Sequence, residues 1–159
     1  NRIVKNIGTI NELKILNSSN DALDIDFSDI SILKTNILTA GNDCIDLSFG
    51  KYKIGETNIS DCGDKAISVG EKSDLASQNL NIMNANIGIA SKDSSKVRLV
   101  NANFKNVEVC LAAYNKKQEF LGGFIMINNF TCKNFSKKTL IDNLSIINLN
   151  NQILQTNEL

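Results

Sequence analysis

The sequence predicts an all-β protein, a right-handed single-stranded parallel β-helix (a solenoid) with about 22 residues per coil and roughly six to seven coils. Apolar residues recur every 22 positions in several columns, one of which is Leu23, Ile45, Ile67, Ile89 and Leu111. Within each repeat, apolar and polar residues alternate over short runs such as 23–27 and 45–49, which is the periodicity of strands. So regular a period predicts coils that bury their apolar residues by stacking, and right-handedness is the default for parallel crossovers.

The predicted elements follow in chain order. Ile3, Val4 and Ile7 indicate an incomplete first coil. Two further columns, which begin at Ile10 and Ile15, place additional strands in each coil. Corners are predicted where turn residues cluster, at 20–21, 41–43, 63–64 and 92–95.

The period is predicted to break twice. Ile59 is followed by Ile82 rather than by residue 81, after which Ile82, Phe104 and Met126 are expected to keep the spacing. A polar stretch with a Gly-Gly pair, 116–123, then predicts an insertion or a wider loop.

The last part of the chain is predicted to close the domain. The apolar run 144–149 indicates a final coil, and the polar tail 150–159 is expected to cap the stack or to fray. The predicted β-helix therefore covers residues 1–149. No signal peptide is visible and residue 1 is not Met, so we expect this domain to be a piece of a larger protein.

Composition excludes several classes of function. With 17 basic and 17 acidic side chains in 159 residues, no net field draws the chain to nucleic acid or to an anionic membrane. No apolar stretch reaches the roughly 18 residues of a spanning helix. The absence of histidine excludes His-based nucleophiles, His bases and the usual metal sites. We therefore predict no nucleic-acid partner, no membrane span and no metal.

The four cysteines are predicted to be small apolar fillers at tight corners. None forms a C-x-x-C pair, and Cys44 and Cys110 share a column with Ala22 and other small residues. The alternative for Cys110 and Cys132 is a disulfide bridge, because the two lie one repeat apart.

Asparagine is frequent, and it suits the corners of a solenoid because it tolerates left-handed turns and stacks into hydrogen-bonded ladders. An AT-rich genome would enrich asparagine too. A turn ladder that bonds to neighbouring coils is predicted at one corner column, which is Asn20, Asn42, Asp64, Asn86 and Glu108.

One outer face is the candidate site. Its outward positions form two columns, Asp24, Asp46, Ser68, Ala90, Ala112 and Asp26, Ser48, Gly70, Lys92, Tyr114. This face changes from acidic to basic and aromatic along the stack. The alternative is an ordinary solvated strand face.

Specific roles can be assigned on this face. Asp24 and Asp46 would lie about 5 Å apart, where two carboxylates raise each other's pKa and can form an acid/base pair. No cofactor is predicted, although such a pair can also bind Ca²⁺. The catalytic candidates are Asp24, Asp46, Lys92 and Tyr114, and the candidates for substrate binding are Tyr114, Lys116 and Lys117.

Strings such as Gly-Asp-Lys-Ala-Ile-Ser-Val-Gly-Glu (63–71) and Ile-Gly-Ile-Ala-Ser-Lys-Asp (87–93) resemble right-handed parallel β-helix proteins of the pectate-lyase-like superfamily. The resemblance covers roughly residues 10–135 and looks closest to bacterial β-helix segments of unassigned function. It implies a secreted, periplasmic or cell-surface protein, with polysaccharide and other domains of the same polypeptide as partners.

Polygalacturonases of this superfamily carry Gly-Asp-Asp-Cys-Ile and Gly-His-Gly-Ile-Ser on successive coils. This chain is similar at Gly-Asn-Asp-Cys-Ile (41–45), where Asp43 matches, and Asp21 matches a third motif of that family. However, Asn42 replaces a catalytic-type aspartate, and Lys65 stands about where the histidine would be. An inverting glycosidase needs an acid and a base carboxylate, and an amide can serve as neither.

The function predicted from these residues is a non-catalytic or degenerate β-helix module that binds glycan or acts as a structural scaffold. The alternative is a polysaccharide lyase, epimerase or glycoside hydrolase that acts on acidic polysaccharide. A lyase needs a base such as Lys or Arg, for which Lys92, Lys116 or Arg98 would serve.

Overall fold

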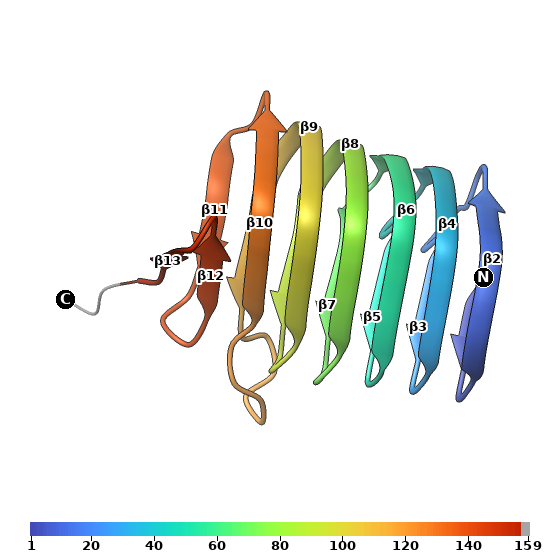
Figure 1. Cartoon of the computed structure of the whole chain (residues 1–159), viewed down its shortest axis with the longest axis horizontal. Helices are drawn as coiled ribbons and strands as arrows, with labels where there is room; N and C mark the ends of the chain where they lie inside the picture. Colours follow the sequence, from blue (N-terminus) through green and yellow to red (C-terminus); the bar gives the residue numbers. More distant parts are fainter. Residues whose placement is uncertain (157–159) are drawn as a thin grey trace.

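The computed structural model describes residues 1–156 and contains a β-solenoid of about seven turns, without a helix in those residues. The coils stack side by side along the long axis, from β2 at one end to β11 and β12 at the other (Figure 1). The predicted all-β fold with stacked parallel coils is confirmed. None of the described residues belongs to a helix long and apolar enough to cross a membrane.

Each coil runs through three stretches of strand, and equivalent stretches of successive coils pair in parallel. We call the three resulting stacks faces A, B and C. Face A contains β1 (Arg2–Val4), β3 (Leu23–Asp26), β5 (Ile45–Ser48), β7 (Lys65–Gly70), the last parts of β8 (Asp74–Lys92) and β9 (Lys96–Tyr114), and β11 (Lys137–Ile141).

Faces B and C are formed by successive parts of the same long strands. These strands are β2 (Ile7–Ile15), β4 (Asp29–Ala40), β6 (Lys51–Cys62), the earlier parts of β8 and β9, and β10 (Phe124–Lys133). β12 (Ile146–Leu149) extends face B, and β13 (Gln152–Leu154) pairs antiparallel with β12. Part of the polar tail therefore forms a strand at this end of the stack, and residues 157–159 lie outside the described residues.

The register confirms the first predicted break and corrects the second. Ile59 pairs with Ile82, so this coil is one residue longer than the 22 of its predecessors. The insertion at 116–123 is present, but it shifts the next coil by six, because Phe124 lies beside Lys96 at a separation of 28. The prediction that Met126 continues the column of Phe104 is therefore wrong.

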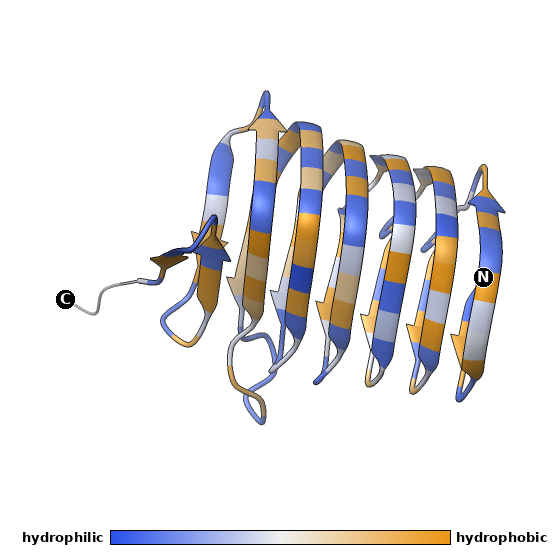
Figure 2. Ribbon diagram, viewed as in Figure 1, coloured by the Kyte–Doolittle hydropathy of each residue, from blue (hydrophilic) through white to orange (hydrophobic). Residues whose placement is uncertain are grey.

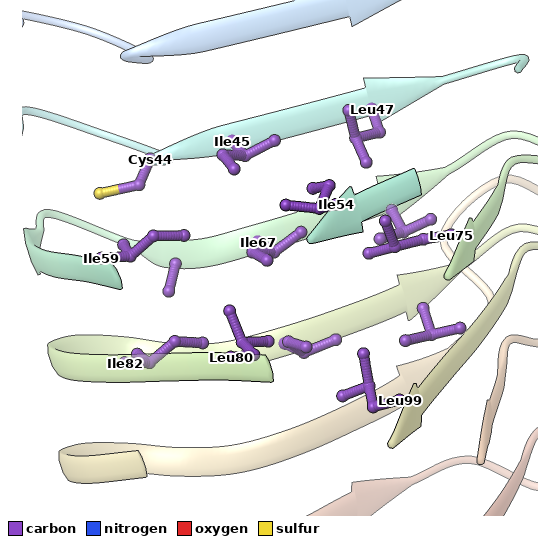
Figure 3. Close-up of a cluster of buried hydrophobic side chains, with 14 of the residues drawn as sticks. Cys44, Ile45, Leu47, Ile54, Ile59, Ile67, Leu75, Leu80, Ile82 and Leu99 are labelled. Carbon is purple, nitrogen blue, oxygen red and sulfur yellow. The ribbon is translucent and has the colours of Figure 1, made fainter. Parts of the chain in front are cut away.

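The core lies between the three faces and is formed by the predicted columns. Leu23, Ile45 and Ile67 are fully buried, and hydrophobic and hydrophilic bands alternate along each strand (Figure 2). Side chains from all three faces project into the interior, for example Ile45 from face A, Ile54 from face B and Ile59 from face C (Figure 3). Polar groups also reach the core: the Thr35 and Thr57 hydroxyls are buried there, and the Tyr52 hydroxyl lies 3.0 and 2.7 Å from the carbonyl oxygens of Ile25 and Ser48.

Ladders of asparagine join the coils, as predicted. In one ladder, Asn84 donates to Asp61 (2.7 Å), Asn106 to Asn84 (3.1 Å) and Asn134 to Asn106 (3.0 Å). These residues have φ between 55° and 58°, the left-handed conformation that asparagine tolerates. A second ladder on face C has Asn36, Asn58, Asn81, Asn103 and Thr131 in sequence.

The predicted ladder at the corner between faces C and A is carried mainly by the backbone. The amide of Asp64 donates to the Asn42 carbonyl, and that of Asn86 donates to the Asp64 carbonyl. The Asn42 side chain instead donates to the Asp21 carboxylate (2.7 Å).

The prediction that the cysteines are simple fillers is wrong. Cys44 is bonded to Cys62 and Cys110 to Cys132, with Cα atoms 5.5 and 6.5 Å apart, and no free cysteine remains in the described residues. The alternative for Cys110 and Cys132 is thereby confirmed. In the first pair, Cys62 is the last residue of β6 and Cys44 directly precedes β5, so the corner between faces C and A brings them together.

Candidate functional site

The candidate face, face A, has the predicted order of outward residues. Asp24 pairs with Asp46, Asp46 with Ser68, and Ser68 with Ala90. In the second column, Lys92 lies beside Tyr114. The structure therefore brings together Asp24 with Asp46, and Lys92 with Tyr114. The coil of β7 separates the two pairs.

The acidic end of face A is engaged by a basic side chain. The Arg2 guanidinium lies 3.3 Å from the Asp24 carboxylate and 2.6 Å from that of Asp26. The pKa of Asp24 is raised, mainly because burial penalises the charged carboxylate, with a further contribution from Asp26. Across the described residues, no group of three or more acidic or cysteine side chains is placed to hold a metal ion.

The middle of face A is closed. Ser68, Ala90 and Ala112 are fully buried although they point outward. Lys92 is only 8% exposed, and its Cε lies 3.5 Å from the position that a Cβ of Gly70 would occupy. An extended chain that crossed this face would not reach the strand surface at these coils.

The insertion lies against the solenoid, and we call residues 115–123 the strap. It connects β9 to β10 and is the orange loop at the lower edge of Figure 1. The buried Asp93 carboxylate accepts the backbone N–H groups of Lys116 (2.7 Å) and Lys117 (2.8 Å). The Lys117 ammonium forms an ion pair with Glu71, which also accepts a hydrogen bond from Ser48 (2.7 Å).

Further contacts, made by Leu121 and Phe120, hold the strap. Ser94 and Leu121 exchange hydrogen bonds of 2.8 Å, from the Ser94 amide to the Leu121 carbonyl and from the Leu121 amide to the Ser94 hydroxyl. The Phe120 ring packs edge-on against Phe49 at 6.3 Å and lies 5.8 Å from the Lys72 ammonium. The proposed binding residues Lys116 and Lys117 therefore belong to a segment that packs back over earlier coils.

The residues that resemble a polygalacturonase site form a ladder at the corner between faces C and A. Asp21 accepts the backbone N–H of Asp43 (3.0 Å), and Asp43 accepts that of Lys65 (2.9 Å). The Lys65 ammonium forms ion pairs with Asp43 and Asp64. Burial raises the pKa of Asp43 in spite of these bonds. Burial also raises the pKa of Tyr114, which lies in the field of Lys65.

Sequence analysis did not identify a groove on the outside of face B. This groove, which we call groove B, has a volume of about 540 Å³. The residues that line it come from five successive coils and include Ser31, Leu33, Lys53, Gly55, Ala76, Gln78, Arg98, Val100, Met126 and Asn128. The signal was available, because these residues alternate with the apolar column of Ile32 and Ile54, which faces the core.

A second groove of about 670 Å³, groove C, lies on face C. The asparagine ladder from Asn36 to Asn103 forms its floor, together with Lys14, Lys105 and other side chains. Its amides already bond to one another along the stack.

The geometry establishes a β-solenoid with a closed candidate face and open grooves on the other two faces. Comparison with protein-family models, with curated proteins and with solved structures finds no match for this chain.

Proposed function

We propose that the chain is a non-catalytic β-solenoid module that binds an extended polysaccharide along its stack of coils. One observation carries the proposal: groove B crosses five coils at right angles to the strands, so it can follow a linear polymer. Its side chains include a hydroxyl, amides and cations that can bond to sugar hydroxyls, together with aliphatic groups that can contact sugar rings.

The surroundings of the candidate catalytic residues support a non-catalytic role. A general acid or base has to reach the proton that it transfers. Asp24 is engaged by Arg2, Lys92 is almost fully buried, and Tyr114 is partly buried. Asp46 lies beside Asp24. An enzyme that used face A would need these four side chains to contact the substrate together, and three of them are engaged or at least partly buried.

A purely structural role is the second candidate, and the ladders and disulfides favour it. The asparagine ladders tie each coil to the next, and both disulfides cross a corner between coils. Such bonds suit a module that holds other domains of the same polypeptide apart.

The disulfides also support a location. Disulfides persist in oxidising compartments and are rare in the cytosol. We therefore propose that this module works outside the cytosol, in a secreted, periplasmic or cell-surface protein.

A glycan array, run with and without Ca²⁺, tests the binding proposal. We expect binding to at least one extended polysaccharide, without a need for Ca²⁺. Binding to none would leave the scaffold role.

A parallel incubation with polyuronates, followed by absorbance for unsaturated products and by a reducing-end assay, tests for an enzyme. Turnover that Asp46→Asn abolishes would overturn the non-catalytic assignment.

A further inference from the structure

We infer that groove B binds the acid groups of an anionic polysaccharide, with Lys53 and Arg98 as its cationic contacts. This inference rests on the proposed function and adds to it the ligand class and the site. Lys53 and Arg98 both line the groove, whereas none of its lining residues is acidic. The lining of groove B therefore has two positive charges and no negative one, in a chain whose total charge is zero, and one of the two cations, Arg98, forms an ion pair with Asp74 outside the lining.

The two cations are held at a fixed spacing by the register. Lys53 pairs with Ala76, and Ala76 pairs with Arg98, so the cations lie in one outward column with one coil between them. Two strand spacings separate them by about 10 Å at the Cα atoms. A ligand that engages both needs acid groups repeated along an extended chain.

Small residues leave room between the cations. Ala76 stands between Lys53 and Arg98, and Gly55, two residues after Lys53 on β6, also lines the groove. A Cβ on Gly55 would lie within hard contact of the Leu33 carbonyl oxygen, so the backbone geometry itself requires glycine there. The gap between the cations can therefore admit a carboxylate or sulfate group.

The one ion pair at these cations, between Arg98 and Asp74, uses a single nitrogen of the guanidinium and, within residues 1–156, leaves Lys53 unpaired. Asp74, to which Arg98 donates (2.5 Å), lines an adjoining hollow that shares Lys53 and Arg98 with groove B, but it does not line groove B itself. Within the described residues, Lys53 is exposed and has no ion-pair partner. Charge-assisted bonds from these two side chains are the strong contacts that a carboxylate or sulfate would make.

The rest of the lining favours a polysaccharide over a nucleic acid. Leu33 is 56% exposed and Val100 is 44% exposed, and Met126 completes an aliphatic wall. Proteins that bind single-stranded nucleic acid stack its bases on aromatic rings, and the lining of groove B contains no aromatic side chain. Aliphatic walls instead suit the C–H faces of sugar rings.

Binding assays with four polymers test this inference on the whole chain: polygalacturonate, heparin, a neutral galactan and oligo(dT). We expect binding to polygalacturonate, to heparin or to both, with an affinity that falls as salt rises. Lys53→Gln and Arg98→Gln should each weaken this binding about tenfold, the loss of one charge-assisted bond. Lys105→Gln, which removes an exposed lysine from groove C, is the matched control and should change the affinity less than about twofold.

Ala76→Glu provides a test that is independent of folding defects. The new carboxylate would lie between the two cations, where opposite charges across strands are favourable, so the thermal midpoint should not fall. The variant should weaken binding about 100-fold, because its carboxylate would pair with Lys53 and Arg98, the two cations that are proposed to contact the ligand.

The outcomes separate this inference from the proposed function. Binding to galactan as tight as to polygalacturonate, or acid binding that these variants leave unchanged, would overturn the inference and leave a polysaccharide-binding module. Equally tight binding to oligo(dT) would overturn the choice of polysaccharide. Binding to none of the three polysaccharides would overturn this inference, and only the absence of binding across the whole glycan array would overturn the proposed function as well.

Discussion

Removing the disulfide between Cys44 and Cys62 is expected to destabilise the early coils without changing the fold. The double variant Cys44→Ala/Cys62→Ala leaves alanine where neighbouring coils already have it, at Ala66 beside Cys44 and at Ala40 beside Cys62. A bridge closes a loop of 18 residues here and of 22 in the other pair. Loop closure of these lengths stabilises by about 3 kcal/mol for each bond.

Thermal and chemical denaturation provide the assay. A loss of about 3 kcal/mol should lower the melting temperature by roughly 6–12 °C in a chain of this size. Hydrogen exchange should accelerate around 40–66 in this variant, and around 105–133 in the matched double variant Cys110→Ala/Cys132→Ala. Reduction of the unsubstituted protein should reproduce the sum of both effects.

The pairing of the four cysteines can be measured directly, and the result tests the two disulfides on which this prediction depends. Without reductant, the unfolded protein should not react with iodoacetamide, and peptide mapping should recover Cys44 with Cys62. Alkylation of all four cysteines would refute the bridges. A pairing of Cys44 with Cys110 would refute the register of the coils.

Two further predictions concern the strap and the ladder. Burial alone would raise the pKa of Glu71, but its bonds with Lys117 and Ser48 outweigh this and lower the pKa below its ordinary value. The Glu71 carboxylate therefore stabilises the fold above its unfolded pKa of about 4.5, and this contribution is lost as the pH falls through the lower folded pKa. In that pH range hydrogen exchange of residues 115–123 should accelerate. Glu71→Gln should remove this pH dependence. Asn84→Ala should cost about 1–2 kcal/mol in urea denaturation, because alanine tolerates the left-handed conformation less well and cannot bond to Asp61.

Each has a control. Glu119→Gln changes another carboxylate on the strap, and an equal effect there would show that general charge, not the Glu71 contact, sets the pH response. Asn84→Gly relieves the backbone conformation but not the lost hydrogen bonds, so it should recover part of the stability. An Asn84→Ala variant as stable as the original would contradict the ladder argument.

The stacking of coils was predictable because side-chain columns are local properties of the sequence. Leu23, Ile45 and Ile67 recur at one interval, and the extra residue before Ile82 is visible as a shift of that interval. The register shift that the insertion causes was harder to predict from the sequence. Apolar residues after it, such as Met126, fit the old spacing by chance, and only pairing with Lys96–Arg98 shows the new register.

The order of the outward residues on face A was predictable from the sequence, but their exposure to solvent was not. Alternation places Ser68, Ala90 and Ala112 outward, and the structure agrees. Their burial depends on the side chains packed around them in three dimensions, which the spacing of residues does not show. The bridge from Cys44 to Cys62 was missed for a related reason, because a separation of 18 reflects the path of a corner rather than the repeat.

The strap changes how the coils depend on one another. In a plain solenoid each coil contacts only its neighbours, so unfolding can begin at one end and proceed coil by coil. Here, Lys117 reaches Glu71 across 46 residues of sequence, and Phe120 reaches Phe49 several coils earlier. Fraying from the C-terminal side has to break these distant contacts early, which couples the middle coils to the late ones and makes their unfolding more cooperative.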